Sequence, residues 1–192
     1  MSFGTLLAKQ KELDSAMVLK YGLDWTLTDC IKNKCIALNS RVIQLVKEYE
    51  INPDNKSTLI DKAIDVLYFG MSLANDFGLD NKTLNDNAGL QASADCFGAR
   101  CRDTFQARRD SGVEPYVWGI LNSLLITTDC IMVYSNWQWY TQPIDIDIDQ
   151  VQLHTTTLLV RVLEVLFALG VLQEGKLGEI YYARYADTKT GL

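Results

Sequence analysis

Apolar side chains recur at three- and four-residue intervals along most of this chain, which is the spacing that places them on one face of an α-helix. No two stretches alternate between apolar and polar residues in the way that two paired, half-buried strands would. The pattern predicts six or more helices, over Phe3–Lys20, Thr28–Glu50, Thr58–Phe77, Ala92–Arg109, Pro115–Tyr140, Gln150–Leu169 and Lys176–Tyr185.

Polar and turn-forming residues separate these segments. Asn52–Asn55 is a turn, Ser57 is the expected cap of the helix that follows it, and Gly78 suits the left-handed position after its end. Asp80–Asn87 is rich in Asn and Asp and is predicted to be a loop. Ile144–Asp149 alternates like a strand, but a lone six-residue strand has no partner, so a linker or helix entry is expected there.

These segments predict an all-α fold made of one domain over residues 1–192. A chain of 192 residues is long enough to bury a hydrophobic core. Hydrophobic residues make up 48% of the sequence and charged residues 22%, a composition that is typical of globular proteins and excludes a disordered one.

Charge and apolar runs exclude several classes of partner. The formal net charge is −6, so no global basic field is available for nucleic acid or an anionic membrane. The longest apolar run, residues 157–171, contains Arg161 and Glu164 and is predicted to be a buried helix rather than a membrane span. The first fourteen residues lack the apolar segment of a signal peptide.

The cysteine pattern indicates reduced thiols in the cytoplasm. An odd number of widely spaced cysteines does not suit a secreted disulfide framework, and their spacing does not match that of zinc sites. We therefore predict a cytoplasmic protein with no structural zinc. The five cysteines are Cys30, Cys35, Cys96, Cys101 and Cys130.

Four stretches occur in this order along the chain: Leu6–Asp14 followed by Tyr21–Leu23 and Trp25, then Cys35–Leu38, Ile64–Leu73, and Leu158–Tyr185. Together they resemble the dimeric dUTPase/dCTPase branch of the all-α, MazG-like nucleoside triphosphate pyrophosphatases. The opening stretch is similar to the family's L-x-x-x-Q-x-x-L-[DN], and the third to its E-x-V-D-x-x-H-F-x-x-S-L. The resemblance covers most of the chain, with residues 80–150 weakly matched.

The resemblance implies a helical bundle of the dimeric dUTPase type and a magnesium-dependent reaction. Family members cleave between the α and β phosphates, giving a nucleoside monophosphate and pyrophosphate. Magnesium neutralises the triphosphate and activates water. An E-x-x-E pair on one helix and an E-x-x-D pair on the facing helix hold the metal, because residues three apart share a helical face.

Most of those metal-binding acids are replaced in this chain. The E-x-x-E pair falls on Arg41 and Gln44, and the E-x-x-D pair falls on Lys62 and Asp65. Asp65 is the only acid among the four positions. Arg41 and Lys62 place cations where the family places magnesium, so we expect no bound metal.

Two acids and one arginine remain as candidate functional residues. Glu48 lies one turn beyond Gln44, and Asp61 lies next to Lys62 but rotated by roughly 100° around the helix. Arg184 stands where the family's closing Y-x-x-K-N has its phosphate-binding lysine, and the arginine-containing tail that follows in the family is missing.

Each candidate group also has a plain structural interpretation. Arg41, Lys62 and Asp65 form either a metal-free anion site or a salt-bridge cluster that fills the former cage. His154 has no nucleophile at a recognisable spacing and is expected to be structural. The aromatic group Trp118, Trp137, Trp139 and Tyr140 is expected to pack in the core or at a dimer interface, and Arg100, Arg102, Arg108 and Arg109 are expected to form a solvated helical face.

The function predicted from the sequence is that of a catalytically degenerate dUTPase-like protein. It would bind a partner protein or a nucleotide and regulate nucleotide metabolism, as a homodimer or paired with an active relative. One alternative is an active dUTP or dCTP pyrophosphatase with a magnesium site rebuilt from Asp61, Asp65, Glu48 or acids of the weakly matched middle. Asp76 and Asp80 are further candidates for such a site. A third interpretation is a structural helical module unrelated to nucleotides.

Overall fold

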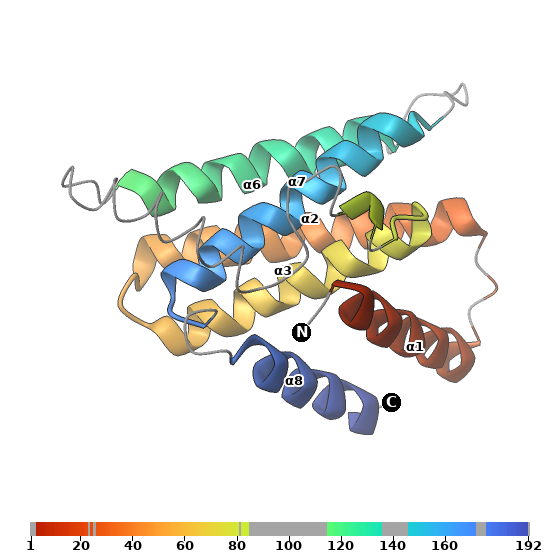
Figure 1. Cartoon of the computed structure of the whole chain (residues 1–192), viewed down its shortest axis with the longest axis horizontal. Helices are drawn as coiled ribbons and strands as arrows, with labels where there is room; N and C mark the ends of the chain where they lie inside the picture. Colours follow the sequence, from red (N-terminus) through yellow and green to blue (C-terminus); the bar gives the residue numbers. More distant parts are fainter. Residues whose placement is uncertain are drawn as a thin grey trace.

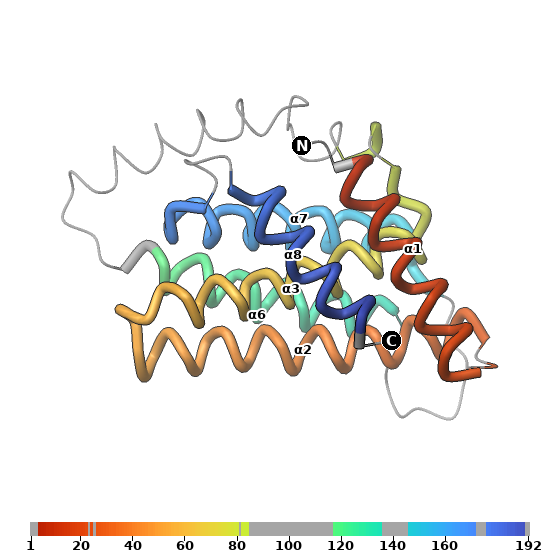
Figure 2. The backbone as a smooth tube through the Cα atoms, turned by 90° about the horizontal axis from the view of Figure 1, so that it is seen from below, coloured from red at the N-terminus to blue at the C-terminus, as the bar shows by residue number. Residues whose placement is uncertain are grey.

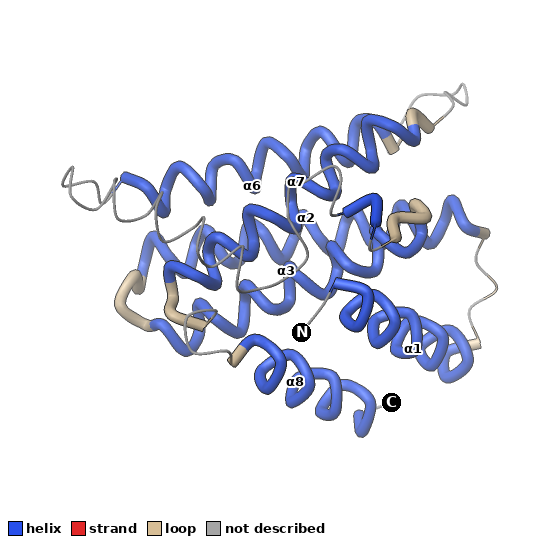
Figure 3. The backbone as a smooth tube through the Cα atoms, in the orientation of Figure 1, coloured by secondary structure: helices blue, strands red, loops and turns tan. Residues whose placement is uncertain are grey.

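The computed structural model describes residues 3–22, 24, 26–80, 82–84, 115–135, 146–171 and 176–191. Within these ranges every regular element is helical and none is a strand (Figure 3). The prediction of an all-α fold is therefore confirmed. The helices are α1 (Phe3–Tyr21), α2 (Leu27–Ile51), α3 (Lys56–Asp76), α6 (Pro115–Tyr134), α7 (Ile148–Ala168) and α8 (Leu177–Gly191).

Helices α2, α3, α6 and α7 form a four-helix bundle (Figure 1). In the bundle α2 packs against α3 and α6, and α7 packs against the same two neighbours. Each helix turns its apolar stripe inward, and Leu38, Leu67, Leu124 and Leu158, one from each helix, are fully buried. Burial of such side chains is the dominant favourable contribution to folding.

Helices α3 and α7 approach each other closely at Gly70. A Cβ atom at this position would lie 2.8 Å from Cδ2 of Leu158 and 2.9 Å from Cδ2 of Leu159. Both leucines are buried, so a larger residue would force them to move. The absence of a side chain at Gly70 thus sets the spacing of this helix pair.

Helices α1 and α8 lie on one side of the bundle, over α3 (Figures 1 and 2). Leu6, Leu7 and Leu13 anchor α1 in the core, and the fully buried Tyr181 anchors α8. The side-chain amide of Asn75 on α3 donates to the backbone oxygen of Leu7 at 3.0 Å. The two outer helices thereby form a second layer against the bundle.

Two predicted helix boundaries were wrong. Asn55, not Ser57, caps α3: its side chain accepts a hydrogen bond from the backbone N–H of Thr58, as asparagine commonly does at this position. The last helix continues past Tyr185 to Gly191. Its final turns are polar and carry no apolar signal, and Lys189 ties them to α1 through Glu12 at 2.6 Å.

The predictions for Gly78 and for the helix entry within residues 144–149 are confirmed where the structure describes them. Gly78 follows α3 with a φ of 70°. Asp147 caps α7, so the described part of residues 144–149 is a helix entry. The predicted loop after Asp80 contains a helical turn at residues 82–84, because the Asp80 carboxylate accepts from the Thr83 backbone at 2.7 Å. Residues 85–114, which include the predicted helix over 92–109, lie outside the described residues.

Two helices are long and apolar enough to span a membrane by length and composition alone. Within the described residues, these are Val117–Tyr134 in α6 and Ile148–Ala168 in α7. Both helices pack into the bundle, and 56% of the α7 segment is buried there. Core helices of soluble proteins have the same composition, so this finding is weak evidence for a membrane.

Candidate functional site

A groove with a volume of about 430 Å³ opens on the side of the bundle where α1 and α8 lie. All of α1, α2, α3 and α8 contribute side chains to its lining, and charged residues line it in two clusters. Asp65, Phe69 and Ser72 follow one another on α3 at four- and three-residue intervals, which turns them toward the groove together. Its apolar walls come from Leu13, Met17, Val18, Ala37 and Phe69.

Asp65 lies between two arginine guanidinium groups at one part of the groove. Arg184 on α8 donates from Nη2 at 2.8 Å and from Nε at 3.2 Å, both to Oδ1 of Asp65. Arg41 on α2 places Nη1 at 3.7 Å from Oδ2, an ion pair without a hydrogen bond. The carboxylate is mostly buried, whereas both guanidinium groups are more than one-third exposed. We call these three residues the Asp65 cluster.

The charge state of the Asp65 cluster follows from its contacts. The hydrogen bonds that Asp65 accepts raise the pKa of Arg184 above its ordinary value, and the charge of the exposed Asp61 acts in the same direction. Arg184 therefore stays protonated. Arg41 also donates from Nη1 to the side-chain oxygen of Gln44 at 3.1 Å.

The structure brings only part of the predicted site together. Arg41 and Asp65 pair as expected, but the predicted pairing of Lys62 with them is wrong: no ion pair of Lys62 occurs among the described residues, and Arg184 takes that place. Lys62 lies one turn before Asp65, which is the first residue of α3 that lines the groove. Glu48 accepts from Asn52 at the end of α2 at 3.2 Å and does not line the groove.

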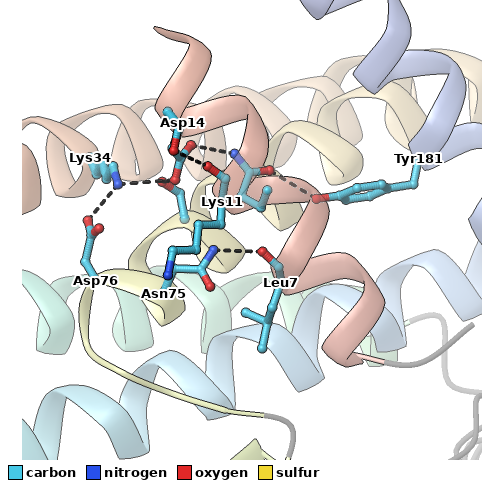
Figure 4. Close-up of polar contacts among 10 residues, drawn as sticks. Leu7, Lys11, Asp14, Lys34, Asn75, Asp76 and Tyr181 are labelled. Carbon is cyan, nitrogen blue, oxygen red and sulfur yellow. Dashed lines mark hydrogen bonds and ion pairs between the residues drawn. The ribbon is translucent and has the colours of Figure 1, made fainter. Parts of the chain in front are cut away.

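The second charged cluster was not predicted. Lys34 on α2 places Nζ at 2.7 Å from Asp76 of α3 and at 3.4 Å from Asp14 of α1 (Figure 4). Asp14 and Lys34 line the groove. Burial raises the pKa of Asp76, while the hydrogen bond and charge of Lys34 act in the opposite direction. We call these three residues the Lys34 cluster.

A chain of hydrogen bonds connects the Lys34 cluster to α8. Ser72 donates to Asp14 Oδ2 at 2.7 Å, and Gln10 donates to Asp14 Oδ1 at 2.8 Å. The hydroxyl of Tyr181 on α8 in turn donates to Gln10 Oε1 at 3.0 Å (Figure 4). Tyr68 stacks on Tyr181 and donates to its backbone oxygen at 2.9 Å. The groove is thus lined by groups whose orientations are fixed.

The residues present do not fit a magnesium site. Of the four positions that the resemblance assigns to metal ligands, only Asp65 offers a carboxylate, and it is engaged by guanidinium groups. Asp76 was a candidate for a rebuilt site, but Lys34 already lies between it and Asp14. Asp80 caps a turn instead. Across the described ranges, no group of three or more His, Cys, Asp or Glu residues is placed to hold a metal ion.

The other singled-out residues have structural roles where they are described. His154 stacks on Tyr134 with ring centroids 5.5 Å apart, and burial lowers its pKa. Trp118 meets Tyr49 edge-on, also at 5.5 Å, between α6 and α2. Burial raises the pKa of the Cys35 thiol to about 11, which makes it unreactive. Cys30 and Cys130 are free, while the remaining tryptophans, cysteines and the arginine-rich segment lie outside the described residues.

No protein-family model, characterised protein or solved structure matches this chain. The groove itself therefore carries the functional argument. Sequence patterns had singled out Arg41, Asp65 and Arg184. The Lys34 cluster had one local signal, the four-residue spacing of Gln10 and Asp14, which places both on the same face of α1.

Proposed function

We propose that this protein is a non-catalytic relative of the all-α dUTP/dCTP pyrophosphatases that binds a nucleotide in the groove and regulates nucleotide metabolism by binding. The observation that carries the proposal is the Asp65 cluster. In it, the one acid retained at the family's ligand positions is paired with Arg184 and Arg41. An acid held in this way is a poor magnesium ligand, and its arginine neighbours are good phosphate ligands.

The arginines retain donors for a ligand. Arg184 uses Nε and Nη2 on a single carboxylate oxygen, and Arg41 contacts Asp65 only at 3.7 Å. A guanidinium group has five N–H donors, so each arginine keeps donors beyond those used in these contacts. Their side chains are also accessible to water, which leaves them accessible to a phosphate group.

The apolar walls suit the other part of a nucleotide. Leu13, Met17 and Phe69 offer a surface against which a flat base can pack, and Asp14 and Lys34 stand beside it as polar partners. A volume of about 430 Å³ falls within the range of small-molecule sites. A base between these walls with its phosphate at the Asp65 cluster accounts for both features of the groove.

Calorimetric titration with dUMP, dUTP and dCTP in the absence of divalent metal tests this proposal. We expect saturable binding, and we expect Arg41→Gln and Arg184→Gln each to weaken it by about tenfold or more, since a lost charge-assisted hydrogen bond is worth about 1.5–3 kcal/mol. Arg161→Gln is the matched control, because Arg161 pairs with Glu164 on α7, away from the groove. Equal weakening in all three variants would contradict the assignment.

The active-enzyme alternative is tested by pyrophosphate release from deoxynucleoside triphosphates with magnesium and with manganese. We expect no turnover. Turnover that disappears in Asp65→Ala would mean that the site does bind metal, and the non-catalytic proposal would be withdrawn. If neither binding nor turnover occurs, the remaining prediction is a regulatory protein partner, and an active dUTPase relative mixed with this chain should then lose activity.

A further inference from the structure

The excess charge of the groove is small and differs in sign between its two charged clusters. Two arginines and one carboxylate make up the Asp65 cluster, which leaves one excess positive charge there. In the Lys34 cluster one ammonium group lies between the carboxylates of Asp14 and Asp76, which leaves one excess negative charge (Figure 4). An anionic ligand therefore finds a single excess positive charge in the groove, and it finds that charge at the Asp65 cluster.

Side chains have to balance the charge of a ligand in this groove, because the described residues do not fit a magnesium site. The cost of removing an ion from water rises with the square of its charge. Its attraction to one excess positive charge rises only in proportion to its own charge. A site with one excess positive charge therefore favours a singly charged group over a doubly charged one.

We propose that Asp65 selects the charge of the ligand, so that the groove prefers a small nucleotide with a singly charged phosphodiester, such as a cyclic mononucleotide, over a nucleoside monophosphate or triphosphate. This inference rests on the proposed function, because it concerns the nucleotide that the groove binds. A phosphodiester carries one negative charge. A phosphomonoester carries close to two at neutral pH, since its second pKa is about 6.

The position of Asp65 makes it the residue that sets this preference. Its Oδ1 accepts both hydrogen bonds from Arg184, and its Oδ2 lies 3.7 Å from Nη1 of Arg41. A phosphate that bridges the two arginines at hydrogen-bond distance comes to lie within about 7 Å of this carboxylate. The carboxylate is mostly buried, so water shields it only in part. Each additional negative charge on the ligand is therefore repelled by Asp65.

The length of the groove favours a small ligand with one phosphate. Lys34 and Arg41 lie seven residues apart on α2, and Asp65 and Ser72 are the same number of residues apart on α3. Seven residues span about 10 Å of helix, given a rise of 1.5 Å per residue. Additional phosphates would extend toward the excess negative charge of the Lys34 cluster or leave the groove. A long nucleic acid is also disfavoured by the formal net charge of −6.

Calorimetric titration of the full chain with dUMP and with the methyl ester of its phosphate tests this inference. The two ligands share the base and the sugar, and they differ by one charge at about pH 7.5, where the monoester has lost its second proton. Divalent metal is left out, since it would neutralise part of the charge of the ligand. We expect the native protein to bind the methyl ester more tightly than dUMP, and to bind dUTP more weakly than either.

Asp65→Asn keeps the shape of the side chain and removes its charge. One more negative charge about 7 Å from a carboxylate weakens binding roughly fiftyfold at an effective dielectric constant of about 20, and exposure of the arginines lowers this to about tenfold. The variant should therefore gain about ten times more affinity for dUMP than for the methyl ester, with an unchanged circular dichroism spectrum. Asp61→Asn is the matched control, because Asp61 acts on Arg184 through its charge from an exposed position. It should change the ratio of the two affinities by less than about twofold.

Several outcomes would overturn the inference and leave the proposed function in place, because nucleotide would still bind. These are tighter binding of dUMP than of its ester by the native protein, and an affinity ratio that Asp65→Asn leaves unchanged or that Asp61→Asn shifts equally. Cyclic dUMP should also bind, and an oligodeoxyuridylate that binds more tightly than cyclic dUMP would overturn the inference in favour of a nucleic-acid interface. Absence of binding by every ligand would overturn the proposed function together with the inference.

Discussion

Replacing Lys34 by methionine should destabilise the protein in a way that depends on pH. Methionine keeps the unbranched length of the side chain but removes the ammonium group that lies 2.7 Å from Asp76 and 3.4 Å from Asp14. Removing one partner of a buried ion pair costs about 3–5 kcal/mol. Lys34 is still 19% exposed, so water screens part of this effect, and we expect a loss of about 2–3 kcal/mol at neutral pH.

The sign of the pH dependence follows from Asp76. Burial already raises its pKa above the ordinary value of 3.8, and Lys34 opposes that rise. Without Lys34 the folded-state pKa of Asp76 rises further. When the pKa of a carboxyl group is higher in the folded state than in the unfolded state, the group stabilises the fold at pH values below its unfolded-state pKa. That contribution is lost as the pH rises through its folded-state pKa. The Lys34→Met deficit should therefore be largest at neutral pH and shrink toward pH 3.8.

Urea unfolding followed by circular dichroism at neutral pH and near pH 4 measures this effect. In thermal unfolding the same loss should lower Tm by about 4–12 °C, given about 2–4 °C per kcal/mol for a chain of this size. Lys47→Met is the control, since Lys47 is exposed on the same helix and should change stability by less than about 0.5 kcal/mol. A Lys34→Met deficit that is the same at both pH values would refute the reasoning.

Two further substitutions test the contacts that hold α8 to α1. Lys189 and other donors lower the pKa of Glu12 to about 2, so its stabilising effect is present above pH 4.5 and is lost as pH falls toward 2. Glu12→Gln should accordingly lower Tm above pH 4.5 but not at pH 2. The loss should be smaller in high salt, which screens the ion pair. An equal loss of Tm at pH 2 would speak against this ion pair. Tyr181→Phe should cost about 1–3 kcal/mol in urea unfolding, because Gln10 Oε1 loses its donor. Tyr182→Phe is its control, and equal costs in both would show that the hydrogen bond is not responsible.

The helices of the bundle could be predicted because their evidence is local. The stripe of α2 and the glycine after α3 are visible in a window of a few residues, and both predictions held. The end of α8 could not be predicted, because its last turns are polar and depend on Lys189 reaching Glu12, a residue 177 positions earlier. The dimeric dUTPase type of bundle stays a prediction.

The candidate site was predictable only where the resemblance to a family motif marked it. Arg41 and Asp65 were identified by their positions in that motif, and they do pair. Lys62 was expected in the same cluster, but the partner of Asp65 is Arg184, 119 residues away. Asp14 and Lys34 meet only because α1 lies across α2 and α3. No periodicity within a helix predicts a contact between helices of different layers.

The two outer helices also bear on how the groove assembles and opens, because α8 and α1 lie far apart along the chain. Helices α2 and α3 follow each other along the chain after a short turn, so their contacts close small loops. The hydrogen bond from Tyr181 to Gln10 closes a loop of 171 residues. We expect this contact to form after the α2–α3 pair, because closing a longer loop costs more entropy. We also expect α8 to open more readily than α3, since it packs against fewer neighbours than the bundle helices do. Amide hydrogen exchange in α8 should therefore be faster than in α3 and should slow when a ligand occupies the groove, which makes this helix a reporter of occupancy.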